Sequence, residues 1–465
     1  MIRRFGCCGL MWLAVVVTGG TVTGQSVGID PVSTASDLAP IPTFGPFLYE
    51  SKPDGVAFEK LNPRKCPPMP EQSLLRKGDR LAIIGDSITE QKMYSRIIET
   101  YLTVCLPQLE IQTRQLGWSG ETAERFLKRM DQDCLRFDPT IATLCYGMND
   151  AKYRPFDFNN SVWFASHYGA IAERLQQSGA RVILGSPGCA GKIAKWTKTK
   201  AGTLDEHNQH LCALRDLTIE IAGEKRVGFA DVFWPMYMAQ VEGDARYSTP
   251  ENPYEVAGSD GIHPGWSGHT IMAYAFLIAM GLDGDLAKFE IDLARNKLSA
   301  SDGHQLESQS DRQWTLTSSR YPFCASGPVD DDGNIRSGMS MVPFNERLNR
   351  WTLRVTGLDA PMAMVHWGDF SQRFPREELA VGVNLAEKFD VNPFSEAFGR
   401  VDQAVAAKQA YETEQIKKRF HSKEGQADIE KTVRETEAER MLLVQAIEAA
   451  RQPVSHTILI EPILP

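Results

Sequence analysis

An alternation of short apolar segments with longer amphipathic ones runs from residue 80 to residue 282 and restricts the folds open to this chain. The apolar segments have the length and content of buried strands. They are RLAIIG (80–85), EIQTRQLG (110–117), TIATLCYG (140–147), RVILGSP (181–187) and VGFADVFW (227–234). Helical patterns separate them, and a last one, WSGHTIMAYAFLIAMG (266–281), closes the series. Strands that alternate with helices predict an α/β domain in which a parallel sheet carries helices on both faces. Functional residues of such sheets gather beyond the carboxyl ends of the strands.

A second region of different character follows Leu282. We interpret the charged stretch that starts at residue 285 as a polar connection. Four segments then read as strands without helices between them: RQWTLTSS (312–319), SGMSMVPF (337–344), NRWTLRVTGL (349–358) and MAMVHWGDF (362–370). Residues 395–451 have a strongly helical, charged pattern. Residues 285–465 are therefore predicted to form a C-terminal accessory region with short strands first and long charged helices after them.

Composition and charge indicate a globular protein and argue against nucleic-acid binding. Of the 465 residues, 42% are apolar and 23% are charged, which is typical of a globular protein. The net charge is −9, and no Lys/Arg cluster marks an electrostatic footprint for nucleic acid, so we expect no nucleic-acid partner.

The N-terminus has the pattern of an export signal. Arg3 and Arg4 precede the apolar run LMWLAVVV (10–17), and the small residues of TGGTVTG (18–24) follow it. We expect a signal peptide at 1–24, an extended Pro/Ser/Gly-rich arm at 25–75, and a periplasmic or secreted protein with no membrane span after cleavage. The alternative is an uncleaved N-terminal anchor, although the run is short for a bilayer.

Cysteine usage leaves disulfide pairing open. Seven cysteines remain after Cys7 and Cys8 of the signal are set aside. Three of them lie in apolar patterns typical of core residues: Cys105, Cys145 and Cys212. The other four lie near loop signals and could pair in an oxidising compartment: Cys66, Cys134, Cys189 and Cys324. No two have CxxC spacing, so we expect no metal site.

Ser87 directly follows the first predicted strand, in GDSITE (85–90). One interpretation is structural: Ser87 and Glu90 have the spacing of a capping box, which begins a helix. The other is catalytic, because a serine at a strand end can act as a nucleophile if a base lies beside it. The two roles are compatible, and the second requires partners.

Three further blocks supply such partners. LGWSGET (116–122) carries Gly120, whose backbone N–H can approach a ligand closely. YGMNDAKY (146–153) carries Asn149, an amide donor. SDGIHPGW (259–266) places Asp260 three residues before His263, so that the carboxylate can hold one ring nitrogen and leave the other free as a base.

Each of these residues also has a structural interpretation. Gly120 can simply end a strand, Asn149 can form an Asx turn, Asp260 can be a turn former, and His263 can be an ordinary core or surface histidine. Their joint occurrence, in this order and at successive strand ends, favours a catalytic site.

The set GDS (85–87), Gly120, Asn149 and DGIHP (260–264) resembles the four signature blocks of the SGNH hydrolases, also called GDSL esterases, over residues 78–283. This resemblance implies a flavodoxin-like three-layer α/β/α domain with a five-stranded parallel sheet, which we place at 76–284. It also implies that Ser87 is the nucleophile, His263 the general base and Asp260 its orienting partner. The N–H groups of Ser87 and Gly120 and the Asn149 amide would form the oxyanion hole, with no metal or organic cofactor.

One position differs from the family pattern. Many relatives carry Asn just before the second glycine block, where this chain has Gln115 and Leu116. The G-x-S-x-G elbow of the α/β-hydrolases is absent from both GDSIT and GWSGE.

Together with the N-terminal export pattern, the resemblance predicts an exported serine esterase for short-chain, above all acetyl, esters on a small molecule or a polysaccharide. Trp118 and Met148 are candidate substrate-binding residues, although Trp118 can equally be a packing residue. The insertion 235–259 carries three tyrosines that could line the site. The alternatives are a lipid or aryl acyl esterase, and a surface binding or scaffold protein whose hydrolase domain is a carrier. The oligomeric state is unknown.

Overall fold

The computed structural model describes residues 48–62, 64–66, 70, 72–197 and 202–464. They belong to one compact unit, Pro40–Pro465. The predicted signal peptide and residues 25–47 of the predicted arm lie outside the described residues. Within the rest of the arm, β1 (Leu48–Glu50) pairs antiparallel with β2 (Arg64–Cys66).

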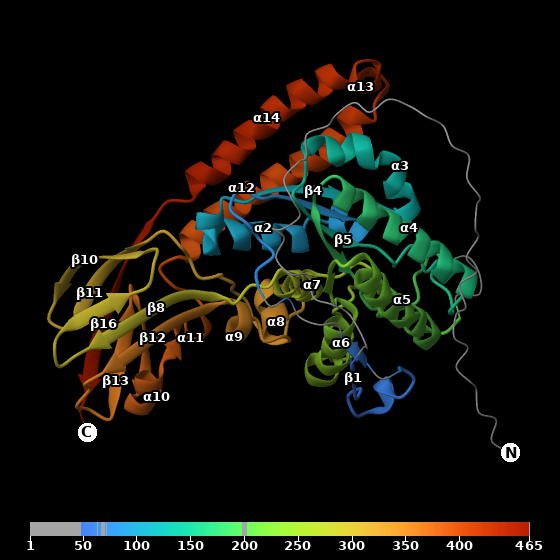
Figure 1. Ribbon diagram of the computed structural model, residues 1–465. Helices are drawn as coiled ribbons and strands as arrows, with labels where there is room; N and C mark the ends of the chain where they lie inside the picture. Colours follow the sequence, from blue (N-terminus) through green and yellow to red (C-terminus); the bar gives the residue numbers. More distant parts are fainter. Residues whose placement is uncertain (1–47, 63, 67–69, 71, 198–201, 465) are drawn as a thin grey trace, which may run out of the picture. The chain divides into compact units, whose positions relative to one another are not determined.

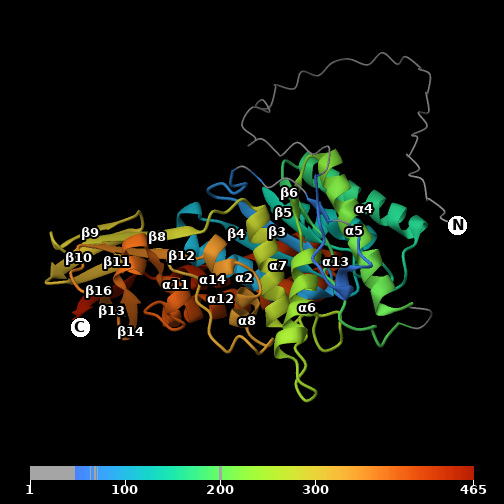
Figure 2. The ribbon, with the colours of Figure 1, turned by 90° about the horizontal axis from the view of Figure 1, so that it is seen from below.

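A five-stranded, wholly parallel sheet in the order β4-β3-β5-β6-β7 forms the centre of the hydrolase region. Figure 1 labels β4 and β5 of this sheet, and Figure 2 also labels β3 and β6. Its strands are β3 (Arg80–Gly85), β4 (Gln112–Gly117), β5 (Ile141–Cys145), β6 (Arg181–Gly185) and β7 (Gly228–Ala230). Nearly every side chain of β3, β5 and β6 is buried, as expected for strands covered on both faces. The predicted fold class is confirmed.

Helices cover the sheet in two groups (Figures 1 and 2). The first group pairs α2 (Tyr94–Cys105) with α7 (Trp266–Ala279). The second consists of α3 (Ala123–Asp133), α4 (Phe158–Gln177) and α5 (Leu204–Lys225), each packed on the next.

The predicted fifth strand is shorter than expected, because α6 (Phe233–Tyr247) begins inside it. Ser186 Oγ accepts the N–H groups of Val232 and Phe233, and Asp231 accepts that of Trp234, so the start of a helix is satisfied at this point. The first half of the segment 235–259, up to Tyr247, is thus helix.

Two of the three tyrosines in that insertion belong to the core. Tyr237 and Tyr254 are buried, and their hydroxyl groups bond to Ala57 O and to the hydroxyls of Ser267 and Ser337. The suggestion that these two tyrosines line the substrate site is therefore wrong.

The C-terminal region contains two sheets whose aromatic residues meet in a common core. One has the order β10-β11-β16-β13-β14 and the other β15-β12-β8-β9. Their strands are β8 (Asp285–Asp292), β9 (Lys297–Ala300), β10 (His304–Ser310), β11 (Gln313–Ser318), β12 (Arg350–Thr356), β13 (Met362–Trp367), β14 (Phe370–Pro375), β15 (Val383–Asn384) and β16 (Val454–Ile463). Trp351 of one sheet stacks on Trp367 of the other at 6.0 Å between ring centroids.

Three expectations for this region were wrong. The stretch expected to be a polar connection forms β8, β9 and β10. Six of the seven β10 side chains are exposed, so β10 lacks the apolar pattern by which a strand is recognised. SGMSMVPF is not a strand but overlaps α8 (Ile335–Ser340), whose N-cap Asn334 accepts the Ser337 N–H. Strands do not all precede the helices, because β16 follows them and lies between β11 and β13.

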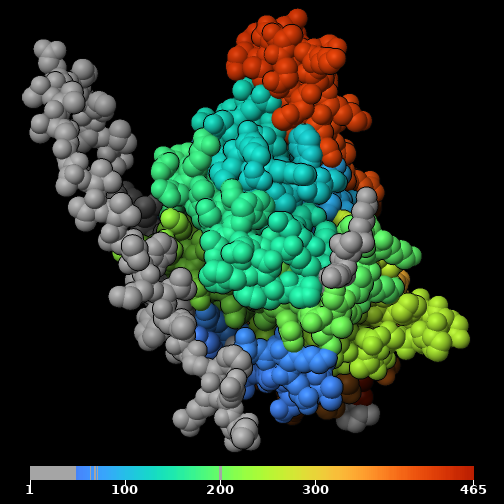
Figure 3. Space-filling model, turned by 90° about the vertical axis from the view of Figure 1, so that its right-hand side faces the viewer, coloured from blue at the N-terminus to red at the C-terminus, as the bar shows by residue number. Residues whose placement is uncertain are grey.

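The long helices of this region are α12 (Ser395–Glu414) and α14 (Ile429–Ala450), joined by a π-helical segment η4 (Gln415–Phe420) and α13 (Lys423–Ala427). Shorter helices are α9 (Phe344–Leu348), α10 (Arg376–Val381) and α11 (Leu385–Lys388). Helix α12 packs against α2 and against β4, the edge strand of the parallel sheet. Figure 3 shows the orange-red C-terminal segment directly against the cyan segment that includes α3, where His421 and Gln426 bond to Asp133 and Gln132.

The seven cysteines of the predicted mature chain are all free, and six of them are buried. In the described part of the chain, no helix is both long and apolar enough to cross a membrane. Nor do the described residues contain a group of three or more His, Cys, Asp or Glu side chains placed to hold a metal ion.

Candidate active site

Ser87, His263 and Asp260 form a hydrogen-bonded chain at the carboxyl end of the parallel sheet. Ser87 Oγ lies 2.8 Å from His263 Nε2, and His263 Nδ1 lies 2.8 Å from Asp260 Oδ2. Ser87 lies two residues after the end of β3, whereas the other two residues lie in the loop before α7. The sequence-predicted partners, 176 positions apart, are thus within hydrogen-bond distance.

The Asp260–His263 turn is held by the aspartate itself. Its Oδ1 accepts the backbone N–H groups of Ile262 and His263, both at 2.8 Å, while Oδ2 receives the ring. Partial burial raises the pKa of Asp260, but the hydrogen bonds from the His263 backbone and ring and from Ile262 outweigh it and hold the pKa below its usual value. The carboxylate therefore stays ionised and fixes Nδ1 as the protonated ring nitrogen, which leaves Nε2 to accept a proton from Ser87.

Gly261 is required in this turn. Its φ is +81°, and a Cβ there would lie 2.3 Å from the backbone nitrogen of Lys192. Gly191 N also donates to Gly261 O at 2.9 Å. The loop after β6 therefore closes tightly on the turn that carries the histidine.

Ser87 is not the helix cap. The N-cap of α1 (Ser87–Glu90) is Asp86, whose Oδ1 accepts the Ile88 N–H at 2.9 Å. Glu90 does not reach back to close a capping box, because its carboxylate binds Ser119 and Lys417. The capping interpretation of Ser87 is therefore wrong, and its hydroxyl is directed to His263. As the first residue of α1, Ser87 has one of the amides that lack an intrahelical acceptor.

Gly120 lies in a turn that follows β4. The turn is closed by Glu121 N and Trp118 O at 3.1 Å, and Gly120 has φ +71°. Trp118 N donates to Gly85 O at 3.0 Å, which ties the turn to the strand that carries Ser87. Among the described residues the Gly120 N–H has no hydrogen-bond acceptor, so it is available to a ligand.

Asn149 is held on both sides of its amide. Its Nδ2 donates to Glu121 O at 3.1 Å and to Asp86 Oδ2 at 3.3 Å, and its Oδ1 accepts the Tyr153 hydroxyl at 2.8 Å. The long contact with Asp86 is the one that a developing oxyanion could most easily share. The three oxyanion residues proposed from the sequence thus come from the ends of three neighbouring strands, β3, β4 and β5.

Two buried carboxyl groups lie behind the site. Burial raises the pKa of Asp86 to about 7; the Ile88 N–H opposes this shift, and the nearby Asp150 and Glu121 carboxylates add to it. Burial likewise raises the pKa of Asp150 to about 6, against hydrogen bonds from the N–H groups of Ala123 and Gly147. Sequence analysis noted neither residue for this role.

The two proposed substrate-binding residues have little free surface. Met148 is buried. The Trp118 ring is contacted edge-on by His421 at 5.0 Å, and the Arg129 guanidinium and the Lys417 ammonium lie 5.0 and 5.1 Å from its centre. The packing interpretation of Trp118 accounts for these contacts.

An aromatic residue that sequence analysis missed, Trp196, lies beside the triad. The Trp196 ring is centred 5.7 Å from that of His263, is 45% exposed, and meets Tyr153 edge-on at 5.8 Å. A single tryptophan in the lysine-rich loop GKIAKWTK (191–198) was the available signal.

Gln115 stands where many members of the family have an asparagine, and its side chain still connects this block to the neighbouring elements of the site. Its Nε2 donates to Thr89 O in α1 at 2.6 Å, and its Oε1 accepts the Thr413 hydroxyl of α12 at 3.3 Å. The substitution therefore keeps a side-chain bond between the second block and the nucleophile helix.

A parallel α/β/α sheet with a Ser-His-Asp chain at the carboxyl ends of its strands has the arrangement of a serine hydrolase. Residues 83–271 match the model of the GDSL-like lipase/acylhydrolase family. The chain therefore carries a GDSL-like lipase/acylhydrolase domain and is a hydrolase of ester bonds.

Solved structures with similar folds include BT4096, a gut microbial diltiazem-metabolizing enzyme. It has 20% identity and a TM-score of 0.68, and the match covers 84% of this chain and 100% of that chain. A catalytic mutant of Axe2, an acetylxylan esterase from Geobacillus stearothermophilus, has 20% identity and a TM-score of 0.37, covering 44% of this chain and 96% of that one. No curated protein sequence matches the chain.

Proposed function

We propose that the protein is an exported serine esterase that hydrolyses short-chain, acetyl-type carboxylic esters through Ser87, His263 and Asp260. The observation that carries this proposal is the chain of two 2.8 Å contacts from Ser87 Oγ through the His263 ring to Asp260. The export signal and the cleavage at 24 rest on the sequence pattern of residues 1–24.

In the proposed reaction, Ser87 Oγ attacks the ester carbonyl carbon while His263 Nε2 accepts its proton. The N–H groups of Ser87 and Gly120 and the Asn149 amide bind the oxygen on which negative charge develops. His263 then gives the proton to the leaving alcohol, and an acyl-Ser87 ester remains. Water, deprotonated by His263, releases the acid and restores the serine.

A ring-bearing alcohol is supported by the position of Trp196. Its exposed ring lies beside His263, the residue that would protonate the leaving group, so a sugar or aryl ring on the alcohol side can pack against it. A short acyl group is suggested by the resemblance to exported members of the family that remove acetyl groups from polysaccharides. A lipid or aryl acyl ester remains the alternative substrate, and a binding or scaffold role the alternative function.

Labelling with a fluorophosphonate, followed by mass spectrometry of the labelled peptide, separates an esterase from a scaffold. We expect the probe on Ser87, and we expect Ser87→Ala to lose both labelling and turnover of p-nitrophenyl acetate while it keeps the wild-type circular dichroism. A wild-type chain that takes no label and has no turnover would overturn the assignment.

A substrate panel tests the alcohol side. Trp196→Ala should lower kcat/KM for acetylated sugars about fivefold, because a ring contact contributes roughly 1 kcal/mol. The kcat/KM for ethyl acetate should stay unchanged. Phe158→Ala, which removes an exposed ring at the start of α4, is the matched control. Equal losses with ethyl acetate would show that Trp196 does not select the alcohol.

A further inference from the structure

The C-terminal region contacts the candidate oxyanion turn directly. Segment η4 and the following His421 pack on Trp118, which opens the turn Trp118–Glu121. Segment η4 has π-helical hydrogen bonding, an irregularity that occurs mostly at functional positions. Lys417 lies within it and is separated from Glu90 by 327 positions in the sequence.

Glu90 joins this segment to the turn. Its Oε1 lies 2.7 Å from Lys417 Nζ, while its Oε2 accepts the Ser119 N–H at 2.5 Å and the Ser119 hydroxyl at 2.6 Å. The side chains of Lys417 and Glu90 are only 26% and 18% exposed, so water screens the pair weakly. Partial burial raises the pKa of Glu90, but Lys417 and Ser119 outweigh it and keep the carboxylate ionised.

The fixed position of Ser119 determines the direction of the next amide. Ser119 and Gly120 share a peptide plane, and the Gly120 N–H belongs to that plane. Because Ser119 N is bound to Glu90 and Glu121 N closes the turn on Trp118, that peptide has little freedom to rotate. A carboxylate released from Ser119 would let the Gly120 N–H turn away from the reacting carbonyl.

The second lysine near Glu90 does not duplicate this contact. Lys92 Nζ binds the backbone oxygen of Glu90 at 2.6 Å, on the helix rather than on the carboxylate. Among the residues that the structure describes, Lys417 is thus the cation that holds the carboxylate group.

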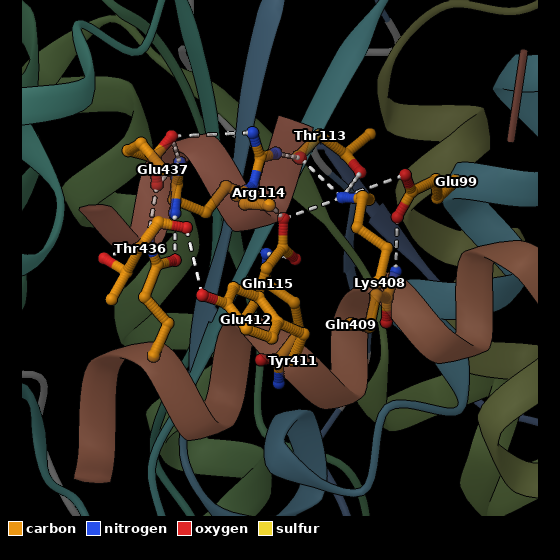
Figure 4. A network of polar contacts seen from close by, with 12 residues as sticks. Glu99, Thr113, Arg114, Gln115, Lys408, Gln409, Tyr411, Glu412, Thr436 and Glu437 are labelled. Atoms are coloured by element: carbon orange, nitrogen blue, oxygen red, sulfur yellow. Dashed lines mark hydrogen bonds and ion pairs between the residues drawn. The ribbon is translucent and has the colours of Figure 1, made fainter. Parts of the chain in front are cut away.

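Three contacts between residues far apart in the sequence hold α12 and α14 on β4, and so determine where Lys417 lies (Figure 4). Glu412 accepts the Gln115 N–H at 3.0 Å, Lys408 donates to Thr113 O at 2.8 Å, and Arg114 forms paired 2.8 Å bonds with Glu437. Strand β4 ends at Gly117, immediately before the turn. The same helices therefore hold both the strand and the loop that it carries.

We propose that Lys417 is a positioning residue of the esterase site: through Glu90 and Ser119 it aims the Gly120 N–H at the oxyanion, so that the C-terminal region completes the catalytic centre. This inference rests on the proposed serine esterase activity. It assigns to residues 415–421 a role in the reaction rather than in folding alone.

The test compares Lys417→Met, Lys417→Arg and the control Lys418→Met, which changes the exposed neighbouring lysine on the same segment. With p-nitrophenyl acetate, Lys417→Met should lower kcat at least tenfold with KM nearly unchanged, because a donor used mainly in the transition state is misdirected. Its inhibition constant for phenylboronic acid, which forms a tetrahedral adduct with the serine, should rise by a similar factor. Lys417→Arg should restore most of kcat, and Lys418→Met should match wild type.

Glu90→Gln keeps the proposal testable if Lys417→Met folds poorly. The glutamine still offers Ser119 an acceptor oxygen, but it has no negative charge for Lys417 to bind. The double variant should be no slower than the slower single variant, because both changes interrupt one chain of contacts. Additive losses, a loss confined to KM, or equal losses in Lys418→Met would overturn the inference. An inactive wild-type chain without Ser87 labelling would instead overturn the proposed function, so the two failures are distinguishable.

Discussion

Acid should destabilise the C-terminal region through two buried histidines, and His456→Gln should reduce this effect. A hydrogen-bond chain passes between its two sheets. Trp367 Nε1 donates to His456 Nδ1 at 3.2 Å, His456 Nε2 and Ser318 Oγ are 2.8 Å apart, and Ser318 Oγ and His304 Nδ1 are 2.8 Å apart. His304 Nε2 then bonds to Leu286 O at 3.1 Å.

The Trp367 indole N–H can only donate, and the Leu286 carbonyl oxygen can only accept. Because these two groups end the chain, every hydrogen bond between them must donate in the same direction, from Trp367 toward Leu286. Both histidines are therefore neutral, with the proton on Nε2. Burial lowers the pKa of His456 from 6.5 to about 3, with a small contribution from His304. Burial also lowers the pKa of His304 to about 4, although its bond to Leu286 O opposes the shift.

The sign and size of the effect follow from these values. Below pH 6.5 these two histidines bind protons in the unfolded chain but stay neutral in the folded chain. The free energy of unfolding therefore falls as the pH falls from 6.5 toward 4. Between pH 6.5 and pH 5 the loss is about 2 kcal/mol for each histidine, from 1.36 kcal/mol per pH unit. The pair should thus cost about 4 kcal/mol at pH 5 relative to pH 8.

Urea denaturation followed by tryptophan fluorescence at pH 8 and pH 5 measures this loss. Glutamine can accept from Trp367 and donate to Ser318 but does not titrate, so the loss between the two pH values should be about 2 kcal/mol smaller in His456→Gln. His207 and His269 titrate alike in both proteins, and their contributions cancel. His366→Gln, at a more exposed histidine of β13, should leave the pH-dependent loss no smaller than in wild type. An undiminished loss in His456→Gln would refute the reasoning.

Three further changes test the site. Asn149→Ala should lower kcat about a hundredfold with little change in KM, measured with p-nitrophenyl acetate; a change in KM alone would assign Asn149 to substrate binding. Gly117→Ala places a Cβ 2.2 Å from Glu90 N and 2.5 Å from Thr89 C, both backbone atoms, and should lower the melting temperature and kcat together. Asp86→Asn removes one acceptor oxygen together with the titrating group, so its effect on the free energy of unfolding should be more favourable at pH 8 than at pH 5. The folded chain keeps the Asp86 proton up to about pH 7 and the unfolded chain releases it near 3.8, so stability falls as the pH rises between these values; an equal effect at both pH values would count against this account.

The parallel sheet could be predicted because its evidence is local. Each of its strands is an apolar run between helical patterns, and the residues of the triad follow such runs or precede the last helix. Once the strands are known to be parallel, the ends that carry Ser87, Gly120 and Asn149 must lie at one edge.

The remaining features depend on contacts that local patterns do not contain. Glu90 has the spacing of a capping box with Ser87, and only the fold shows that its partners are Ser119 and Lys417. Strand β10 is recognisable by its pairing with β11 rather than by its exposed polar side chains. Trp196 lies beside His263 because two loops meet, which no spacing predicts.

The buried charges between α12 and β4 explain how a C-terminal helix can serve a site formed by residues far earlier in the chain. Burial alone would raise the pKa of Glu412, but the surrounding cations Lys408, Arg440 and Arg114 outweigh it and keep the carboxylate ionised. A buried ion pair contributes little net stability compared with apolar packing, yet breaking one typically costs about 3–5 kcal/mol.

A shift of α12 along β4 would break several of these pairs at once, so one register is strongly preferred. Lys408 must face Glu99 and the Thr113 carbonyl, and Glu412 must face the Gln115 N–H. In that register Lys417, five residues beyond Glu412, reaches Glu90. An apolar contact of the same area would tolerate sliding, and the Gly120 amide would then lose its fixed direction. The buried ion pairs therefore fix the register that brings Lys417 to Glu90 and, through it, to the oxyanion turn.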